Sequence, residues 1–319
     1  DQPNMRPYQL FDWDPEKPDQ LTSVHSDLTF PNELYPEDQV LTAINAKGEV
    51  VEYPYYEDAE GKRYFHTAHI WYKKRQYVLN QIGSLAMNDP SGAARVLQKF
   101  AEVYEGYVPI YDHTWNNRPL NIEAGPPYPY YGGMWDWWFF MDLGQVNKLS
   151  YAYSLIKDTD VFEKLSQQTG ENVREKIVEG MFLPSIEFIR TYSNRKTNMD
   201  FHIWRGLVEM GKAIDRPDLV HEGMERLAAF VANEYFFDGF YKEITYSYHA
   251  QSINGNNAVI RLLNGWSDPQ GFVSQRTGTR LEDLDMGAQY PILQKSQNVM
   301  RDLTYPDGKY VPIQDTWAW

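Results

Sequence analysis

The sequence predicts an all-α fold, in which successive antiparallel helical hairpins form an α/α toroid or an incomplete barrel behind a coil-rich N-terminal arm. Two observations predict it. Segments with apolar residues at helical spacing dominate from residue 67 onward, and the connections between most of them are short. A chain of 319 residues without a Pro/Ser/Gly-rich linker favours one main domain. We place this domain at 61–319 and the arm at 1–60.

The first 60 residues differ in composition from the rest of the chain. They are rich in proline and acidic residues and poor in helical periodicity, as in FDWDPEKPDQ and FPNELYPEDQ. This composition predicts irregular coil that packs on the outside of the main domain.

Eight helical segments are expected after the arm. They span about 67–87, 90–106, 144–157, 160–191, 199–214, 216–235, 250–264 and 282–303. Asp89-Pro90, Asp160 and Arg216-Pro217 mark positions where helices start or stop. Two loops, 111–138 and 236–257, interrupt the helical rhythm. No internal repeat is visible, which argues against a solenoid of strict period.

Charge and composition exclude several classes of protein. A formal net charge of −14 argues against a nucleic-acid partner, because a phosphate backbone requires a basic face. No apolar run approaches the roughly 18 residues that a membrane span needs. The chain has no cysteine, so disulfides and thiolate chemistry are excluded. No signal peptide is visible, but a chain that begins without Met suits a cleaved, mature form, and we expect a secreted or periplasmic protein.

The segment TNMDFHIWRG places three polar side chains on one helix face. Asn198, His202 and Arg205 are spaced at i, i+4 and i+7, and a separate apolar stripe already supplies the core contact of this helix. A solvated face is one interpretation. The flanking Phe201 and Trp204 favour another, the wall of a cleft.

The loop 111–138 is crowded with tryptophan and tyrosine, and it also contains amide and guanidinium donors. Flat amphipathic rings suit the faces of pyranose sugars, and the donors suit hydroxyl and carboxylate groups. The alternative is that several of these rings belong to the core. The candidates for sugar binding in this loop are Trp135, Trp137, Trp138, Tyr131, Asn117 and Arg118.

Three motifs together resemble a family. MWDWWFFMDLGQVNKL, KTNMDF and DGFYKEITYSYH resemble, in order and spacing, segments of the toroidal polysaccharide lyases that cleave hyaluronan, chondroitin and xanthan. The third motif is also similar to the Asp-Gly-x-Tyr-x-Glu…Tyr-His segment of the heparinase II/III and oligoalginate lyases, as YPDGKYVPIQDTW is to the end of their helical domain. The resemblance covers about 130–319. It departs at Ala258, where the hyaluronan-type enzymes carry a further tyrosine.

The resemblance implies β-elimination at a uronic acid, which leaves a 4,5-unsaturated uronide. The enzyme must neutralise the sugar carboxylate and stabilise the enolate-like charge that develops when the C5 proton leaves. Asn198, with His202 or Arg205, suits that task. Tyr248 is the expected proton carrier, and His249 would assist it or serve as the base.

Further roles follow from the same resemblance. Tyr246 is the fallback tyrosine, and Lys242 would bind substrate and favour a phenolate. No cofactor and no metal are needed, and His66 and His69 are expected to be ordinary helix residues because no third-ligand pattern accompanies them. The expected partner is an acidic polysaccharide or oligosaccharide, and the oligomeric state stays open.

Two other functions compete with the lyase. An inverting glycosidase on an α/α barrel would use a pair of carboxylates, with Asp136, Asp142, Asp238 and Glu243 as candidates, although Asp238-Gly239 is also typical of a turn. A non-catalytic glycan-binding protein would use the aromatic groove without turnover. A hydrolase of neutral sugars would not need the polar stripe of Asn198 and His202, and a binding protein would have no activity for Tyr248→Phe to remove.

Overall fold

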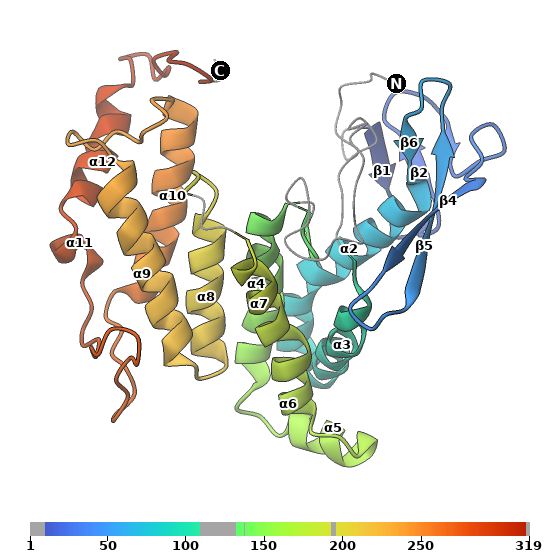
Figure 1. The fold of residues 1–319 in the computed structure, drawn as a ribbon, viewed down its shortest axis with the longest axis horizontal. Coiled ribbons are helices and arrows are strands. Elements are labelled where there is room, and N and C mark those ends of the chain that lie inside the picture. The colour runs from blue at the N-terminus through green and yellow to red at the C-terminus, as the bar shows by residue number, and fades with distance from the viewer. Residues whose placement is uncertain (1–9, 109–131, 137, 193–195, 317–319) are drawn as a thin grey trace. The chain divides into compact units, whose positions relative to one another are not determined.

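The computed structural model describes residues 10–108, 132–136, 138–192 and 196–316 (Figure 1). The chain separates into two compact units. Unit 1 comprises 1–139 and 152–191, and unit 2 comprises 140–151 and 192–319. This division differs from the expected boundary at residue 60, because the N-terminal segment packs on helices of unit 1 while the later helices form a core of their own.

Each expected segment contains a helix, so the prediction of a mostly helical fold is confirmed. Two expectations were wrong: α10 begins at Tyr246, inside the expected loop 236–257, and the expected helix 282–303 is divided into α11 and α12. Unit 1 contains α2 (His66–Asn88), α3 (Pro90–Val103), the 3-10 turn η1 (Tyr104–Gly106), α5 (Val161–Thr169), α6 (Val173–Ile177), the π-turn η4 (Val178–Phe182) and α7 (Leu183–Arg190). Helix α4 (Phe139–Ile156) has residues in both units, because 140–151 belong to unit 2. Unit 2 contains α8 (Phe201–Ala213), α9 (Pro217–Glu234), α10 (Tyr246–Leu263), α11 (Met286–Gln289) and α12 (Ile292–Asp302).

The helix boundaries follow local capping chemistry. Asp89 caps α3, because its Oδ1 accepts a hydrogen bond from the Gly92 N–H at 2.9 Å, and prolines occupy the first turns of α3 and α9. The expected helix 160–191 is divided, since Gly170 ends α5 in a left-handed conformation. Within the described part of the chain, no helix combines the length and the hydropathy needed to cross a bilayer.

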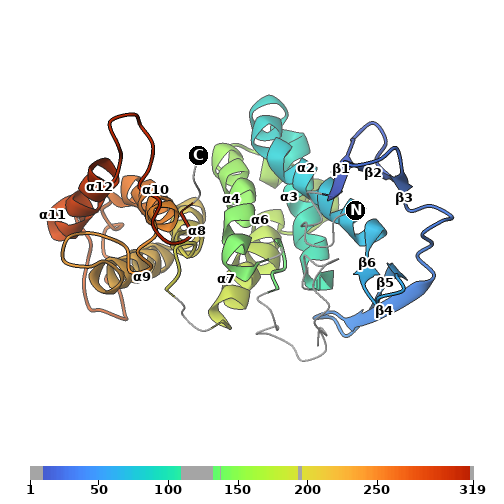
Figure 2. The same ribbon diagram turned by 90° about the horizontal axis from the view of Figure 1, so that it is seen from above.

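The expectation of an all-α fold with a coil arm was wrong for the N-terminal segment, which forms two small antiparallel sheets (Figure 2). The first has the order β1 (Phe11–Trp13), β2 (Leu21–Ser23), β3 (Thr29–Phe30), and the second β4 (Gln39–Ile44), β5 (Val50–Glu57), β6 (Arg63–Tyr64). The proline-rich, acidic composition of 1–60 gave no sign of the hairpin turn that joins β4 to β5. Asn45 Oδ1 accepts from the N–H groups of Lys47 and Glu49, and Gly48 supplies the positive φ that this turn requires.

Two histidines anchor this segment on α2. The His66 ring stacks on Phe30, with centroids 4.6 Å apart, and meets Phe11 edge-on at 5.4 Å. Burial lowers the pKa of His66 to about 4 and that of His69 to about 3. His66 Nδ1 and His69 Nε2 are buried without a hydrogen-bond partner, so both imidazoles are held neutral among aromatic rings.

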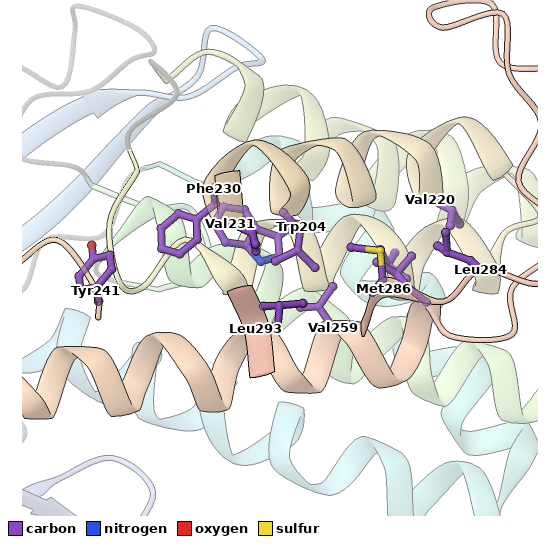
Figure 3. Packing of buried hydrophobic residues seen from close by; sticks show 12 residues of the cluster. Trp204, Val220, Phe230, Val231, Tyr241, Val259, Leu284, Met286 and Leu293 are labelled. Carbon is purple, nitrogen blue, oxygen red and sulfur yellow. The ribbon is translucent and has the colours of Figure 1, made fainter. Parts of the chain in front are cut away.

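The core of unit 2 lies between α8, α9 and α10 (Figure 3). Trp204 of α8, Phe230 of α9 and Val259 of α10 are buried together in one cluster, which α11 and α12 extend. Gly223 allows α9 to pack closely against the backbone of α8. A Cβ at this position would lie 2.8 Å from the carbonyl oxygen of Trp204, so a larger residue would force α8 and α9 apart.

We predict that acid destabilises unit 1 through these two histidines. Since the native state binds fewer protons than the unfolded state between about pH 6.5 and pH 4, stability falls as the pH drops through that window, by about 3 kcal/mol for His66 alone. The double variant His66→Phe/His69→Phe should flatten this acid limb in urea unfolding measured across the window. The control is the exposed His25→Gln. An equally steep loss in the double variant would contradict the prediction.

Candidate functional site

The segments that precede α8 and begin α10 meet in unit 2. Asn198 lies in the turn before α8, not inside the helix as expected, and its Nδ2 donates a hydrogen bond to Oε1 of Gln251 at 2.6 Å. Gln251 follows Tyr248 by three residues, so the two side chains lie on the same face of α10. The contact therefore brings the amide of Asn198 within about one helical turn of Tyr248.

The turn that carries Asn198 is fixed by a buried carboxylate. Asp200 is 2% exposed, and its two oxygens accept hydrogen bonds from the N–H of Thr197 at 3.2 Å and from its Oγ1 at 2.7 Å. The loop closed by these bonds spans only four residues. Asn198 is consequently held in place from both sides, by the turn and by Gln251.

Tyr248 is partly exposed and packs against the unit 2 core together with Phe201. Its hydroxyl has no hydrogen-bond partner among the described residues. A tyrosine whose ring is anchored and whose hydroxyl is unengaged can exchange a proton with a bound molecule.

His202 is partly buried and neutral. Its ring lies 4.1 Å from that of Phe201, and its Nδ1 would be 3.1 Å from a Cβ placed on Gly144 of α4. Burial, together with the charge of Arg205, lowers the pKa of His202 to about 4. At neutral pH this imidazole can serve as a neutral hydrogen-bonding group, and it carries no positive charge.

Arg205, which is exposed, forms an ion pair with the partly buried Glu209 one turn further along α8. Its Nε donates to Oε1 of Glu209 at 2.9 Å. At Arg205 the structure therefore agrees with the first interpretation of the polar stripe, in which an i,i+4 pair lies on a solvated helix face. The polar stripe of α8 therefore divides into a surface ion pair and a part, Asn198 and His202, that faces other elements.

His249 was expected to assist Tyr248, and the structure corrects that role. The side chain is 0% exposed, its Nδ1 accepts from the backbone N–H of Tyr241 at 3.1 Å, and its Nε2 donates to the carbonyl of Ser296 at 2.9 Å. Both ring nitrogens are engaged, and burial lowers the pKa of the imidazole. His249 ties the connection before α10 to α12 and has no free nitrogen for a substrate proton.

The fallback tyrosine is also held by packing. Tyr246 is buried and stacks on Tyr310, with ring centroids 4.1 Å apart, and burial raises its pKa. Lys242 is partly exposed, but its Nζ binds the carboxylate of Glu234 at 2.5 Å. Of the expected proton carriers, Tyr248 alone combines exposure with an unengaged hydroxyl among the described residues.

The expected role of Trp135 in sugar binding is corrected as well. Its ring is completely buried in unit 1, where it stacks on Tyr104 at 5.4 Å and donates from Nε1 to Oγ of Ser185 at 3.0 Å. Trp138, directly before α4, is partly buried. The other aromatic and amide candidates of this loop lie outside the described residues, namely Trp137, Tyr131, Asn117 and Arg118.

The carboxylates of the glycosidase alternative lie in different environments. Asp136 is buried in unit 1 and Asp142 in unit 2. Asp238 is exposed and accepts the Phe240 N–H at 2.9 Å, as in an Asx turn. Glu243 accepts a hydrogen bond from the Tyr241 hydroxyl at 3.0 Å. Within the described residues, no group of three histidine or acidic side chains is placed to hold a metal ion.

Sequence reasoning missed two residues of this region. Gln251 could have been found from its spacing to Tyr248, because i and i+3 share a helix face. Glu234 gives no such signal, since its partners Lys196 and Lys242 come from separate connections.

The comparisons with known proteins add no family assignment. No protein-family model matches the sequence, and no curated protein matches it closely enough to count as a relative.

We predict that Gly255→Ala disrupts this region. A Cβ on Gly255 would lie 2.2 Å from the ring of Phe201, so the ring beside His202 must move, and such overpacking costs about 1–3 kcal/mol. Urea unfolding should show this loss, whereas the exposed neighbour Asn254→Ala should leave stability nearly unchanged. A Gly255→Ala variant as stable as the wild type would show that α8 and α10 are not in such close contact.

Proposed function

We propose that the protein is a polysaccharide lyase that cleaves an acidic, uronate-containing glycan by β-elimination. The observation that carries the proposal is the 2.6 Å hydrogen bond between Asn198 and Gln251, which sets an amide beside the partly exposed Tyr248. The resemblance of the three motifs to toroidal lyases supports it. An α/α toroid as the arrangement of the helices, and a secreted or periplasmic location, belong to the same proposal.

The two amides would neutralise the carboxylate of the sugar. Nδ2 of Asn198 has two N–H groups. One donates to the side-chain oxygen of Gln251, so the other can donate to a ligand. The amide of Gln251 adds two further donors, because its oxygen is the acceptor in this contact. Donors fixed before substrate binds stabilise the charge that develops on the enolate, and His202 would add a neutral donor next to Asn198.

Tyr248 would move the proton. Its phenolate oxygen takes the C5 hydrogen as a proton, and the electrons of that C–H bond form the double bond between C4 and C5. The bond between C4 and the glycosidic oxygen breaks, and the Tyr248 hydroxyl gives the proton to the leaving oxygen. A positive local charge would attract an acidic polymer to a chain whose net charge is −14. Lys196 and Lys242 would contribute positive charge at this end of α9.

The glycosidase has less support. Asp238 forms a turn, and Asp136 and Asp142 belong to separate units. The inverting reaction requires a pair of carboxylates at a defined separation, and of the candidates in unit 2 Asp238 is engaged in its turn and Glu243 in a hydrogen bond with the Tyr241 hydroxyl.

The test is ultraviolet absorbance of the unsaturated uronide with alginate, glucuronan, hyaluronan, chondroitin sulfate, heparan sulfate and pectin. We expect a rise with at least one polymer. Because general acid–base catalysis is typically worth about 100-fold or more, Tyr248→Phe should lower that rate by at least this factor. The exposed Tyr305→Phe serves as the control and should retain full activity. Flat traces on all six polymers, with reducing ends released from another glycan, would overturn the proposal.

A further inference from the structure

Glu234 is a buried carboxylate at the point where the two segments of the candidate site meet. It is the last residue of α9 and is 7% exposed. Its Oε2 lies 2.5 Å from Nζ of Lys242, and its Oε1 lies 3.4 Å from Nζ of Lys196. A buried carboxylate is strongly destabilising unless it is paired, so both lysines are constrained to approach α9.

The same three residues are linked through the backbone. Nζ of Lys242 also donates to the carbonyl of Lys196 at 2.9 Å, and the backbone N–H of Lys242 donates to the carbonyl of Glu234 at 2.9 Å. Lys196 precedes Asn198 by two residues, and Lys242 precedes Tyr248 by six. We call Glu234, Lys196 and Lys242 the Glu234 clamp. This clamp fixes the turn before α8 and the connection into α10 at the same end of α9.

We propose that Glu234 is a positioning residue, which sets the separation between Asn198 and Tyr248 without contacting the substrate. The inference rests on the proposed function, because elimination needs the carboxylate contact and the proton carrier on one sugar ring. A misplacement of about 1 Å can cost roughly 100-fold in rate. The role expected for Lys242 changes accordingly, from a substrate contact to a member of this clamp.

The test compares Glu234→Gln with Glu222→Gln on the polymer that the wild type cleaves. Glu222 is also buried in α9, but its ion pair is with Arg226 on the same helix. Glu234→Gln should lower kcat by about 10- to 100-fold with KM within about threefold, because transition-state positioning is lost while binding is kept. Glu222→Gln should keep the wild-type kcat. Glu234→Asp, which retains the charge, should recover part of the loss.

Amide hydrogen exchange provides a readout that needs no substrate. Exchange in 196–200 and 242–248 should speed up in Glu234→Gln but not in Glu222→Gln. If the wild type cleaves no uronate polymer, the proposed function fails, and exchange alone decides whether the clamp orders the two segments. Equal exchange in all three proteins, or an unchanged kcat in an active Glu234→Gln, would overturn the inference.

Discussion

The close packing of α8 on α9 and α10 is the constraint on which the rest of unit 2 depends. Gly223 lets the α9 backbone approach Trp204, and Gly255 lets α10 accept the ring of Phe201. This close packing accompanies the hydrogen bond between Asn198, in the turn before α8, and Gln251 of α10. The candidate site therefore depends on helix packing, and a larger side chain at either glycine would have to push α8 away from its neighbour.

Buried polar contacts then select one arrangement of these helices. Nε1 of Trp204 donates to Oδ1 of Asn256 at 3.2 Å, Nδ2 of Asn256 donates to the hydroxyl of Tyr235 at 3.1 Å, and that hydroxyl lies 2.5 Å from Oγ of Ser252. An apolar core alone tolerates small shifts of one helix along another, whereas a buried network loses hydrogen bonds when it shifts. Together with the Glu234 clamp, it fixes the ends of the helices that carry the site.

Periodicity predicted the positions of most helices, and breaker residues such as Asp89-Pro90 predicted their boundaries, because both signals are local. The burial of individual aromatic residues was not predictable in this way. Trp135 matches a sugar platform in composition, yet its partner Ser185 lies 50 residues away in the sequence. His249 matches a base in its motif, but its two partners come from another turn and from α12. Contacts between distant segments decide whether such a side chain lies in the core or in a site.

Product mass after cleavage in isotopically labelled water tests elimination most directly. Elimination breaks the glycosidic bond without adding water, so the new non-reducing end is unsaturated and no labelled oxygen enters the product. Asn198 beside Tyr248 predicts this result on a uronate polymer. Saturated products that each carry one labelled oxygen would show hydrolysis and would contradict the account.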